Sequence, residues 1–200
     1  MSVVVADTGL GNVRSVVRAL EHAGARGVVL SGDPEIVRRA GALVFPGQGG
    51  FGDCARALGD GLGEAVREAI ARGAQFLGIC LGLQVLFASS EEAPGCDGLG
   101  VFAGRVVRLR GAPGIKIPHV GWNVAERTRA TWLLEPAEHF YFVHSYVVAP
   151  DDASLACATT EHGERFVSAI ERDNVAAVQF HPEKSQRAGL ALLERFLARC

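Results

Sequence analysis

The sequence predicts an α/β fold with a mainly parallel central sheet, helices on both faces, and additional antiparallel strands in the C-terminal half. Over the first 87 residues, short apolar runs alternate with helix-like segments, which is typical of parallel sheets. After residue 95, strand-like runs follow one another with only turn signals between them. The chain has 200 residues, of which 48% are hydrophobic, so we expect residues 1–200 to form a single domain with a sizeable core.

The first half of the chain contains four apolar runs with the length of buried strands. These runs are Val3–Ala6, Val28–Leu30, Ala42–Phe45 and Phe76–Ile79. Ligands of such sheets bind beyond the carboxyl ends of the strands, so those ends are where we look for a site.

Helix-like segments connect these strands. Apolar residues recur at helical spacing from Val13 to Leu20 after a capping Asn12, and from Leu62 to Ile70, where Glu68 is placed to pair with Arg72. Asp33-Pro34-Glu35 has the pattern of a short helix start. A helical pattern also follows Cys80, through Leu83, Leu86 and Phe87.

The second half of the chain reads as six strands and a closing helix. The expected strands are Val101–Leu109, Ile115–Val120, His139–Val148, Leu155–Thr160, Phe166–Ile170 and Val175–Phe180. Several of them are expected to be antiparallel. Ser185 is expected to cap a final helix that carries Leu190, Leu193 and Leu197.

Composition excludes several classes of function. The formal net charge is -2 and the arginines form no basic stripe, so no nucleic-acid partner is expected. The apolar start of the chain, Ser2–Ala6, is too short for a signal peptide or a membrane span. The five cysteines are odd in number and lack C-x-x-C spacing, which argues against disulfides and zinc. We expect a cytoplasmic protein without a cofactor or a metal.

Cys80 lies where the apolar strand Phe76–Ile79 turns abruptly into the following segment. The sequence Gly78-Ile79-Cys80-Leu81-Gly82 has the spacing of a nucleophile elbow, with a thiol in place of the usual hydroxyl. Glycines on both sides remove side chains that would clash in so tight a turn. The start of the next helix favours the thiolate, which is the reactive form. The alternative is a buried cysteine that acts only as a small hydrophobe.

A glycine-rich loop, 46–52, follows the strand Ala42–Phe45. Gly47, Gly49 and Gly52 fit the letters of a dinucleotide-binding fingerprint, but the acidic residue expected about twenty positions later is missing. The lysine of a phosphate-binding loop is missing too. A glycine loop at a strand's carboxyl end can instead offer backbone N–H groups to a developing oxyanion.

His181 is the histidine best placed to act as a base. Glu183 stands two residues further on, and residues i and i+2 of an extended chain point to the same side. Pro182 keeps His181 out of helical backbone. Glu183 is therefore expected to orient the imidazole, as the third member of a catalytic triad does. If the preceding strand is parallel to the others, this pair lies at the same sheet edge as Cys80.

These motifs together resemble the class I (triad) glutamine amidotransferases, whose fold is flavodoxin-like. Within that family the chain is similar to the glutaminase subunits of imidazole glycerol phosphate synthases. The resemblance rests on segments 7–12, 46–51, 78–84, 120–123, 141–146 and 180–185, which span essentially the whole chain. Thr8 and Gln48 depart from the family pattern. Because the loop around Gln48 is thought to act through its backbone, we expect activity to survive that change.

The resemblance implies a role for each matched residue. Cys80 would be the nucleophile, His181 the general acid and base, and Glu183 its orienting partner. Oxyanion donors would come from Leu81 and from the loop at Gln48 and Gly49. The remaining glutamine contacts would come from Gly47, Gly49, Gln84, His144, Ser145 and Tyr146. For Gln84 and His144, a purely structural hydrogen-bonding role is the alternative.

The resemblance also implies a partner. Ammonia would pass to a cyclase subunit with a (β/α)8 barrel, which would form imidazole glycerol phosphate in histidine biosynthesis. The two subunits would form a heterodimer through a surface that includes Asn12, Trp122, Tyr141 and Lys184. Trp122 has a core position as its alternative.

Three other functions remain open on the sequence alone. The chain could serve a different amidotransferase, as its glutaminase subunit. It could be a free-standing γ-glutamyl hydrolase, which would need no cyclase. It could also be a binding module that has kept the fold without the activity.

Overall fold

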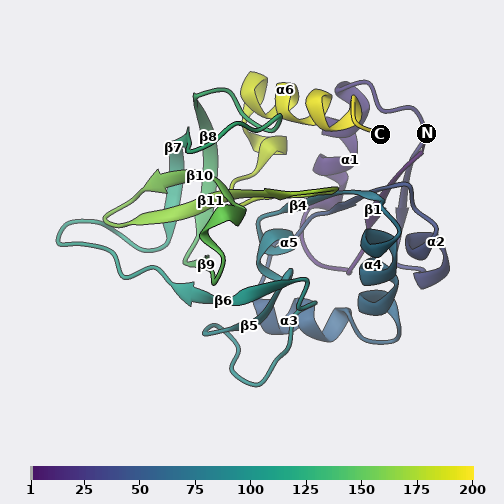
Figure 1. Ribbon diagram of the computed structural model, residues 1–200, viewed down its shortest axis with the longest axis horizontal. Helices are drawn as coiled ribbons and strands as arrows, with labels where there is room; N and C mark the ends of the chain where they lie inside the picture. The colour runs from purple at the N-terminus through teal and green to yellow at the C-terminus, as the bar shows by residue number, and fades with distance from the viewer. Residues whose placement is uncertain (1) are drawn as a thin grey trace.

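The computed structural model describes residues 2–200. Within these residues, twelve strands join in one sheet, six α-helices pack around it, and two short 3-10 helices interrupt the connections. The sheet runs through the middle of the molecule, and its antiparallel half extends to the left in Figure 1. This arrangement confirms the predicted α/β class.

Five strands form the parallel half of the sheet. In spatial order they are β2 (Val28–Ser31), β1 (Val3–Ala6), β3 (Ala42–Phe45), β4 (Gln75–Ile79) and β12 (Val175–Val178). Both faces of β1 are buried: Val3 and Val5 pack on one side, and Val4 and Ala6 on the other. Strands buried on both faces read as continuous apolar runs, which is why the sequence reveals them.

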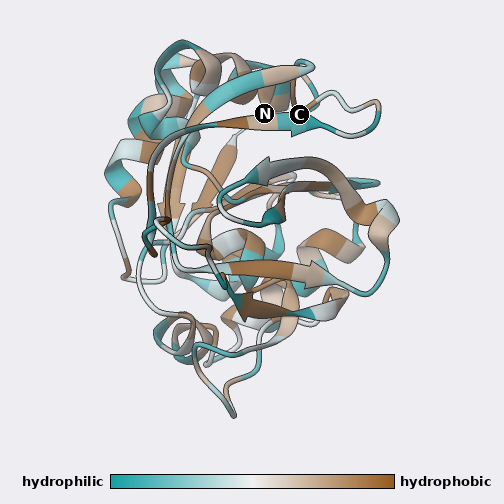
Figure 2. Ribbon diagram, turned by 90° about the vertical axis from the view of Figure 1, so that its left-hand side faces the viewer, coloured by the Kyte–Doolittle hydropathy of each residue, from teal (hydrophilic) through white to brown (hydrophobic). Residues whose placement is uncertain are grey.

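Helices cover the two faces of the parallel half in separate groups (Figure 1). One face carries α1 (Val13–His22) and α6 (Gln186–Leu197), and the other carries α2 (Pro34–Arg38), α3 (Phe51–Ala57) and α4 (Leu62–Ala71). The strands carry runs of hydrophobic residues, whereas the helices alternate between hydrophobic and hydrophilic residues (Figure 2). The predicted caps at Asn12 and Asp33 are confirmed, since each side chain accepts a backbone N–H of the first turn.

The antiparallel half continues from β12. The strands β11 (Arg165–Arg172), β10 (Ala156–Glu161), β7 (His119–Arg127) and β8 (Ala137–His144) follow in that order. A side branch is formed by β9 (Tyr146–Pro150), β6 (Phe102–Arg108) and β5 (Phe87–Ser90). The short elements are α5 (Leu81–Gln84), η1 (Ala153–Leu155) and η2 (Pro182–Lys184).

Several predicted boundaries in the second half are wrong. The strand expected at 115–120 begins only at His119 and runs on to Arg127, because it pairs along its length with β8 and is exposed on one side. The strand expected at 139–148 is two strands that break at Ser145, where the chain leaves β7 and pairs with β6 and β11 instead. The last strand ends at Val178, two residues early.

The first half also differs from prediction in local detail. The helix after Cys80 ends at Gln84, and Phe87 opens the strand β5. The glycine loop is shorter than expected, since α3 already begins at Phe51. Glu68 pairs with Arg38 of α2 at 2.6 Å instead of with Arg72, because α2 and α4 pack side by side.

Candidate active site

Cys80 occupies a strained turn between β4 and α5. Its backbone has φ 54° and ψ -103°, a conformation that costs a non-glycine residue about 1–3 kcal/mol. The backbone at Gly82 touches β3, since a Cβ there would lie 1.9 Å from the Phe45 carbonyl oxygen. Gly78 is equally constrained, with the Gly82 oxygen 2.6 Å from an added Cβ. The predicted elbow is therefore confirmed in its backbone geometry.

The glycine loop after β3 lies directly against this turn. A Cβ at Gly47 would come within 2.4 Å of the Leu81 Cβ, so the loop backbone and the start of α5 are in contact. Leu81 is the first residue of α5, and the N–H of such a residue has no acceptor within its own helix. The backbone of the loop and the start of α5 thus meet next to Cys80.

His181 and Glu183 lie beyond the end of β12, which is parallel to β4 and adjacent to it. His181 Nδ1 and Glu183 Oε1 are 2.8 Å apart, and both side chains are at least 98% buried. The link between them is the 3-10 turn η2, not the extended chain that the sequence suggested, although His181 itself is extended. The predicted pair forms all the same.

Ser185 was expected to cap α6, but its side chain makes no capping hydrogen bond to that helix. It instead holds the backbone around His181. Its Oγ donates to the His181 carbonyl oxygen at 2.6 Å and accepts from the Tyr141 N–H at 2.9 Å. The histidine is thereby tied to strand β8 as well as to β12.

Charge at the site opposes the effect of burial on His181. Burial lowers the pKa of the imidazole, but the negative charge of Cys80 and the hydrogen bond and charge of Glu183 outweigh it. The pKa of His181 is raised to about 10. Its Nε2 is buried and has no hydrogen-bond partner among the described residues, so it is available for proton transfer.

A cavity of about 230 Å³ opens over Cys80 and His181. It lies below the 300–1,000 Å³ of pockets for drug-sized ligands, and therefore suits a molecule of amino-acid size. Ten residues of the predicted site and partner surface line it: Gln48, Gly49, Cys80, Leu81, Gln84, His144, Ser145, Tyr146, His181 and Lys184.

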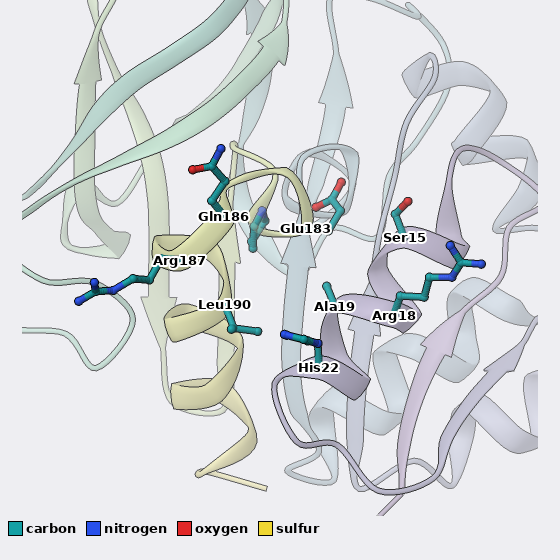
Figure 3. A pocket seen from close by; sticks show the side chains of 9 residues that line it. Ser15, Arg18, Ala19, His22, Glu183, Gln186, Arg187 and Leu190 are labelled. Atoms are coloured by element: carbon teal, nitrogen blue, oxygen red, sulfur yellow. The ribbon is translucent and has the colours of Figure 1, made fainter.

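Other predicted residues lie outside this cavity. Gly47, Glu183 and Asn12 line a small space of about 10 Å³ between the glycine loop and α1. A larger cavity of about 610 Å³ separates α1 from α6, where Ser15 and Arg18 lie across from Gln186 and Arg187 (Figure 3). Among the described residues, its walls include Glu183 but not Cys80, so the thiol does not act there.

The sequence did not identify three residues of the site. Glu92 and Val143 line the cavity, and Glu92 Oε2 accepts the Phe51 N–H at 2.9 Å. Gln179 is buried and its Nε2 lies 3.6 Å from Cys80 Sγ. Only Gln179 leaves a signal in the sequence, as a polar residue that directly follows the apolar strand Val175–Val178.

The predicted partner residues lie at or near the surface. Trp122 is 48% exposed, which excludes the core position, and it packs edge-on against Tyr141 with ring centroids 6.2 Å apart. Val120, on the same side of β7, is 55% exposed. Asn12 and Lys184 are also exposed.

All five cysteines are free thiols. Within residues 2–200, no cluster of three or more His, Cys, Asp or Glu side chains has the arrangement of a metal site. In the same range, no helix combines the length and hydrophobicity needed to cross a lipid bilayer.

Several solved structures share this fold. A crystal structure of a glutamine amidotransferase superposes with a TM-score of 0.74 and 22% identity, covering 98% of this chain and 97% of that one. The structure of PurLQS from Thermotoga maritima gives a TM-score of 0.71 at 20% identity, covering 99% and 97%. At these identities the likeness concerns the fold alone.

Sequence comparison is more specific. The family described as "Glutamine amidotransferase class-I" matches residues 4–200. The imidazole glycerol phosphate synthase subunit HisH of Aquifex aeolicus is 48% identical, with 98% of this chain and 96% of that protein covered. The HisH subunit of Nitrosomonas europaea is also 48% identical, with 98% and 97% covered. The chain therefore belongs to the class I glutamine amidotransferases, within the HisH subunits of imidazole glycerol phosphate synthase.

Proposed function

We propose that this chain hydrolyses L-glutamine at Cys80 and delivers the ammonia to a cyclase subunit. The observation that carries the proposal is the cavity of about 230 Å³, in which a strained cysteine faces a buried histidine that a glutamate holds at 2.8 Å. Membership of the HisH subunits supports the choice of synthase over another amidotransferase or a free-standing hydrolase.

In the proposed reaction, the Cys80 thiolate attacks the side-chain amide carbon of glutamine. The Leu81 N–H and an N–H of the loop at Gln48 or Gly49 bind the oxyanion, and each such donor contributes roughly 10²–10³ in rate. His181 gives its proton to the departing ammonia and leaves a γ-glutamyl thioester. It then takes a proton from water, whose hydroxide hydrolyses the thioester to glutamate and restores the thiolate. Glu183 keeps the imidazole in the required orientation throughout.

The amino-acid end of glutamine is assigned to the rest of the cavity. Gly49, Gln84, His144, Ser145 and Tyr146 supply backbone and side-chain contacts there, and Gly47 contributes from the adjoining backbone of the glycine loop. Two charged side chains in the lining, the carboxylate of Glu92 and the ammonium of Lys184, complement the two charges of an amino acid. Gln84 and His144 also hydrogen-bond within the protein, so they hold the cavity in shape as well.

The partner is assigned to the surface around Trp122. Asn12, Trp122, Tyr141 and Lys184 would contact a (β/α)8-barrel cyclase, which uses the ammonia to form imidazole glycerol phosphate in histidine biosynthesis. An exposed tryptophan beside a half-buried tyrosine is a typical anchor of a protein interface. We infer a heterodimer in which residues 1–200 act as one domain, since one sheet connects both halves of the chain.

The glycine loop is the element assigned to respond to the partner. It connects the oxyanion donors to α3, whose first N–H is held by Glu92. We propose that this loop rearranges when the cyclase and its ligand bind. Glutamine hydrolysis by the isolated chain is then expected to be slow until they do.

The experiment is ammonia release from glutamine with and without the cyclase subunit. Wild type should be stimulated, and Trp122→Ala should need a higher cyclase concentration, by roughly 30-fold for a contact worth about 2 kcal/mol. Ile36→Ala is the matched control, because Ile36 is 42% exposed on α2 and lies away from the predicted interface. An absence of stimulation in wild type would overturn the assignment to this synthase.

A further inference from the structure

Gln179 is a buried polar residue that the triad mechanism does not use. It follows β12, is fully buried, and its backbone N–H donates to the Ser168 carbonyl oxygen of β11 at 2.9 Å. Its side chain contacts two residues that line the substrate cavity, with Nε2 3.6 Å from Cys80 Sγ and Oε1 3.3 Å from Gln84 Nε2.

The direction of these hydrogen bonds is set by the neighbouring groups. Gln84 Nε2 donates to the Tyr146 carbonyl oxygen at 3.0 Å, so Gln84 presents its amide N–H groups to this region. Gln179 must then offer its oxygen to Gln84, which leaves its own N–H groups to face the sulfur. A donor aimed at a sulfur favours the charged thiolate over the neutral thiol.

The chain of hydrogen bonds continues past Tyr146. His144 Nδ1 donates to the same Tyr146 oxygen at 3.1 Å, and His119 Nδ1 lies 3.2 Å from His144 Nε2. Burial lowers the pKa of His144 to about 3 and that of His119 to about 4, so both rings are neutral and can accept as well as donate. Asn123 Nδ2 then donates to His119 Nε2 at 3.2 Å.

We propose that Gln179 is a positioning residue for Cys80, which fixes the sulfur by N–H donation and ties it to Gln84 and Tyr146 of the substrate cavity. The inference rests on the proposed function. It gives the thiol a hydrogen-bond donor that is anchored to the wall of the cavity proposed to receive the amino-acid end of glutamine. A merely structural Gln179 would stabilise the fold and leave the reactivity of the thiol unchanged.

The test is the pH profile of Cys80 alkylation by iodoacetamide, read by mass spectrometry of the Cys80 peptide. Gln179→Met keeps the volume and removes the donor. Loss of a hydrogen bond to the thiolate makes the charged form of Cys80 less stable by enough to change the thiol–thiolate equilibrium about tenfold. Alkylation at neutral pH should therefore slow about tenfold, and the pH profile should move upward by about one pH unit. Ser168→Ala is the control. It removes a buried hydroxyl on the adjacent strand β11, and this hydroxyl has no hydrogen-bond partner among the described residues. Its profile should match wild type.

A second variant keeps the test decisive if Gln179→Met does not fold. Gln179→Glu retains the shape and the acceptor for Gln84, and its ionised form has no donor for the sulfur, so it should shift the profile in the same direction. A wild-type profile in either folded variant would overturn the inference. Glutamine hydrolysis by wild type in the presence of the cyclase subunit, measured on the same preparations, tests the proposed function separately. Failure there would leave the alkylation result for Gln179 standing.

Discussion

At the scale of single residues, the site depends on how His181 holds its proton. A pKa raised to about 10 keeps the imidazole charged through neutral pH, as the proposed protonation of departing ammonia requires. Because the pKa of His181 in the folded protein lies above the usual histidine value of 6.5, its contribution to stability is complete below pH 6.5 and is lost as the pH rises towards 10.

Glu183→Gln should lower the pKa of His181, because the carboxylate supplies both a hydrogen bond and a charge that favour the imidazolium. The loss of stabilisation should then be complete at a lower pH than in wild type, and glutamine hydrolysis should fall by roughly 10²–10⁴ as the ring loses its orientation. NMR titration of the His181 ring measures the first effect. Glu194→Gln, on the exposed side of α6, is the control. An unchanged His181 titration in Glu183→Gln would contradict this role.

At the scale of elements, the elbow depends on the contact between α5 and β3. Gly82→Ala places a Cβ 1.9 Å from the Phe45 oxygen, and a backbone carbonyl inside a sheet cannot move aside. Overpacking of this kind costs about 3 kcal/mol, which should lower Tm by roughly 6–12 °C. Calorimetry gives the shift.

Gly50→Ala is the matched control for that substitution. Gly50 lies at the same sheet edge, but an added Cβ would meet its nearest neighbour at 3.6 Å, an ordinary contact. Its Tm should change little. Equal Tm values for Gly82→Ala and wild type would show that the turn does not depend on this close approach.

Local sequence was enough to predict the geometry of two parts of the candidate site. The elbow around Cys80 and the His181–Glu183 pair are each contained in a few consecutive residues, so their patterns are visible without the fold. Gln179 and Glu92 were missed because their contacts cross the chain: Gln179 meets a sulfur 99 residues away, and Glu92 meets an N–H 41 residues away. The spacing of hydrophobic residues along the sequence does not predict contacts between residues so far apart.

The strand errors have a related cause. The run 139–148 looks like one strand because its apolar pattern is continuous, yet the chain changes partners at Ser145. Only the pairing of β9 with β6 and β11 reveals that break. The full extent of β7 is hidden in the same way, since its residues 121–127 are mixed in polarity and owe their strand structure to β8.

At the scale of the whole molecule, function follows from the place of β12 in the sheet. This late strand lies parallel to β4 and between it and the antiparallel half. It therefore carries Gln179, His181 and Glu183 to the edge where Cys80 lies. The antiparallel half contributes strand β8 and Tyr146 at the start of β9 to the wall of the same cavity, and β7 presents Trp122 nearby. The proposed nucleophile, substrate cavity and partner surface thus share one side of the sheet.

The most direct test of this account is detection of the γ-glutamyl thioester on Cys80. The chain with its cyclase subunit is mixed with glutamine, quenched in acid during turnover, digested and examined by mass spectrometry. We expect the γ-glutamyl group on the Cys80 peptide of wild type and of the control Cys96→Ala. Cys80→Ala should carry no such group and should release no ammonia above background. Ammonia release by Cys80→Ala at the wild-type rate, or a γ-glutamyl group on another residue, would contradict the account.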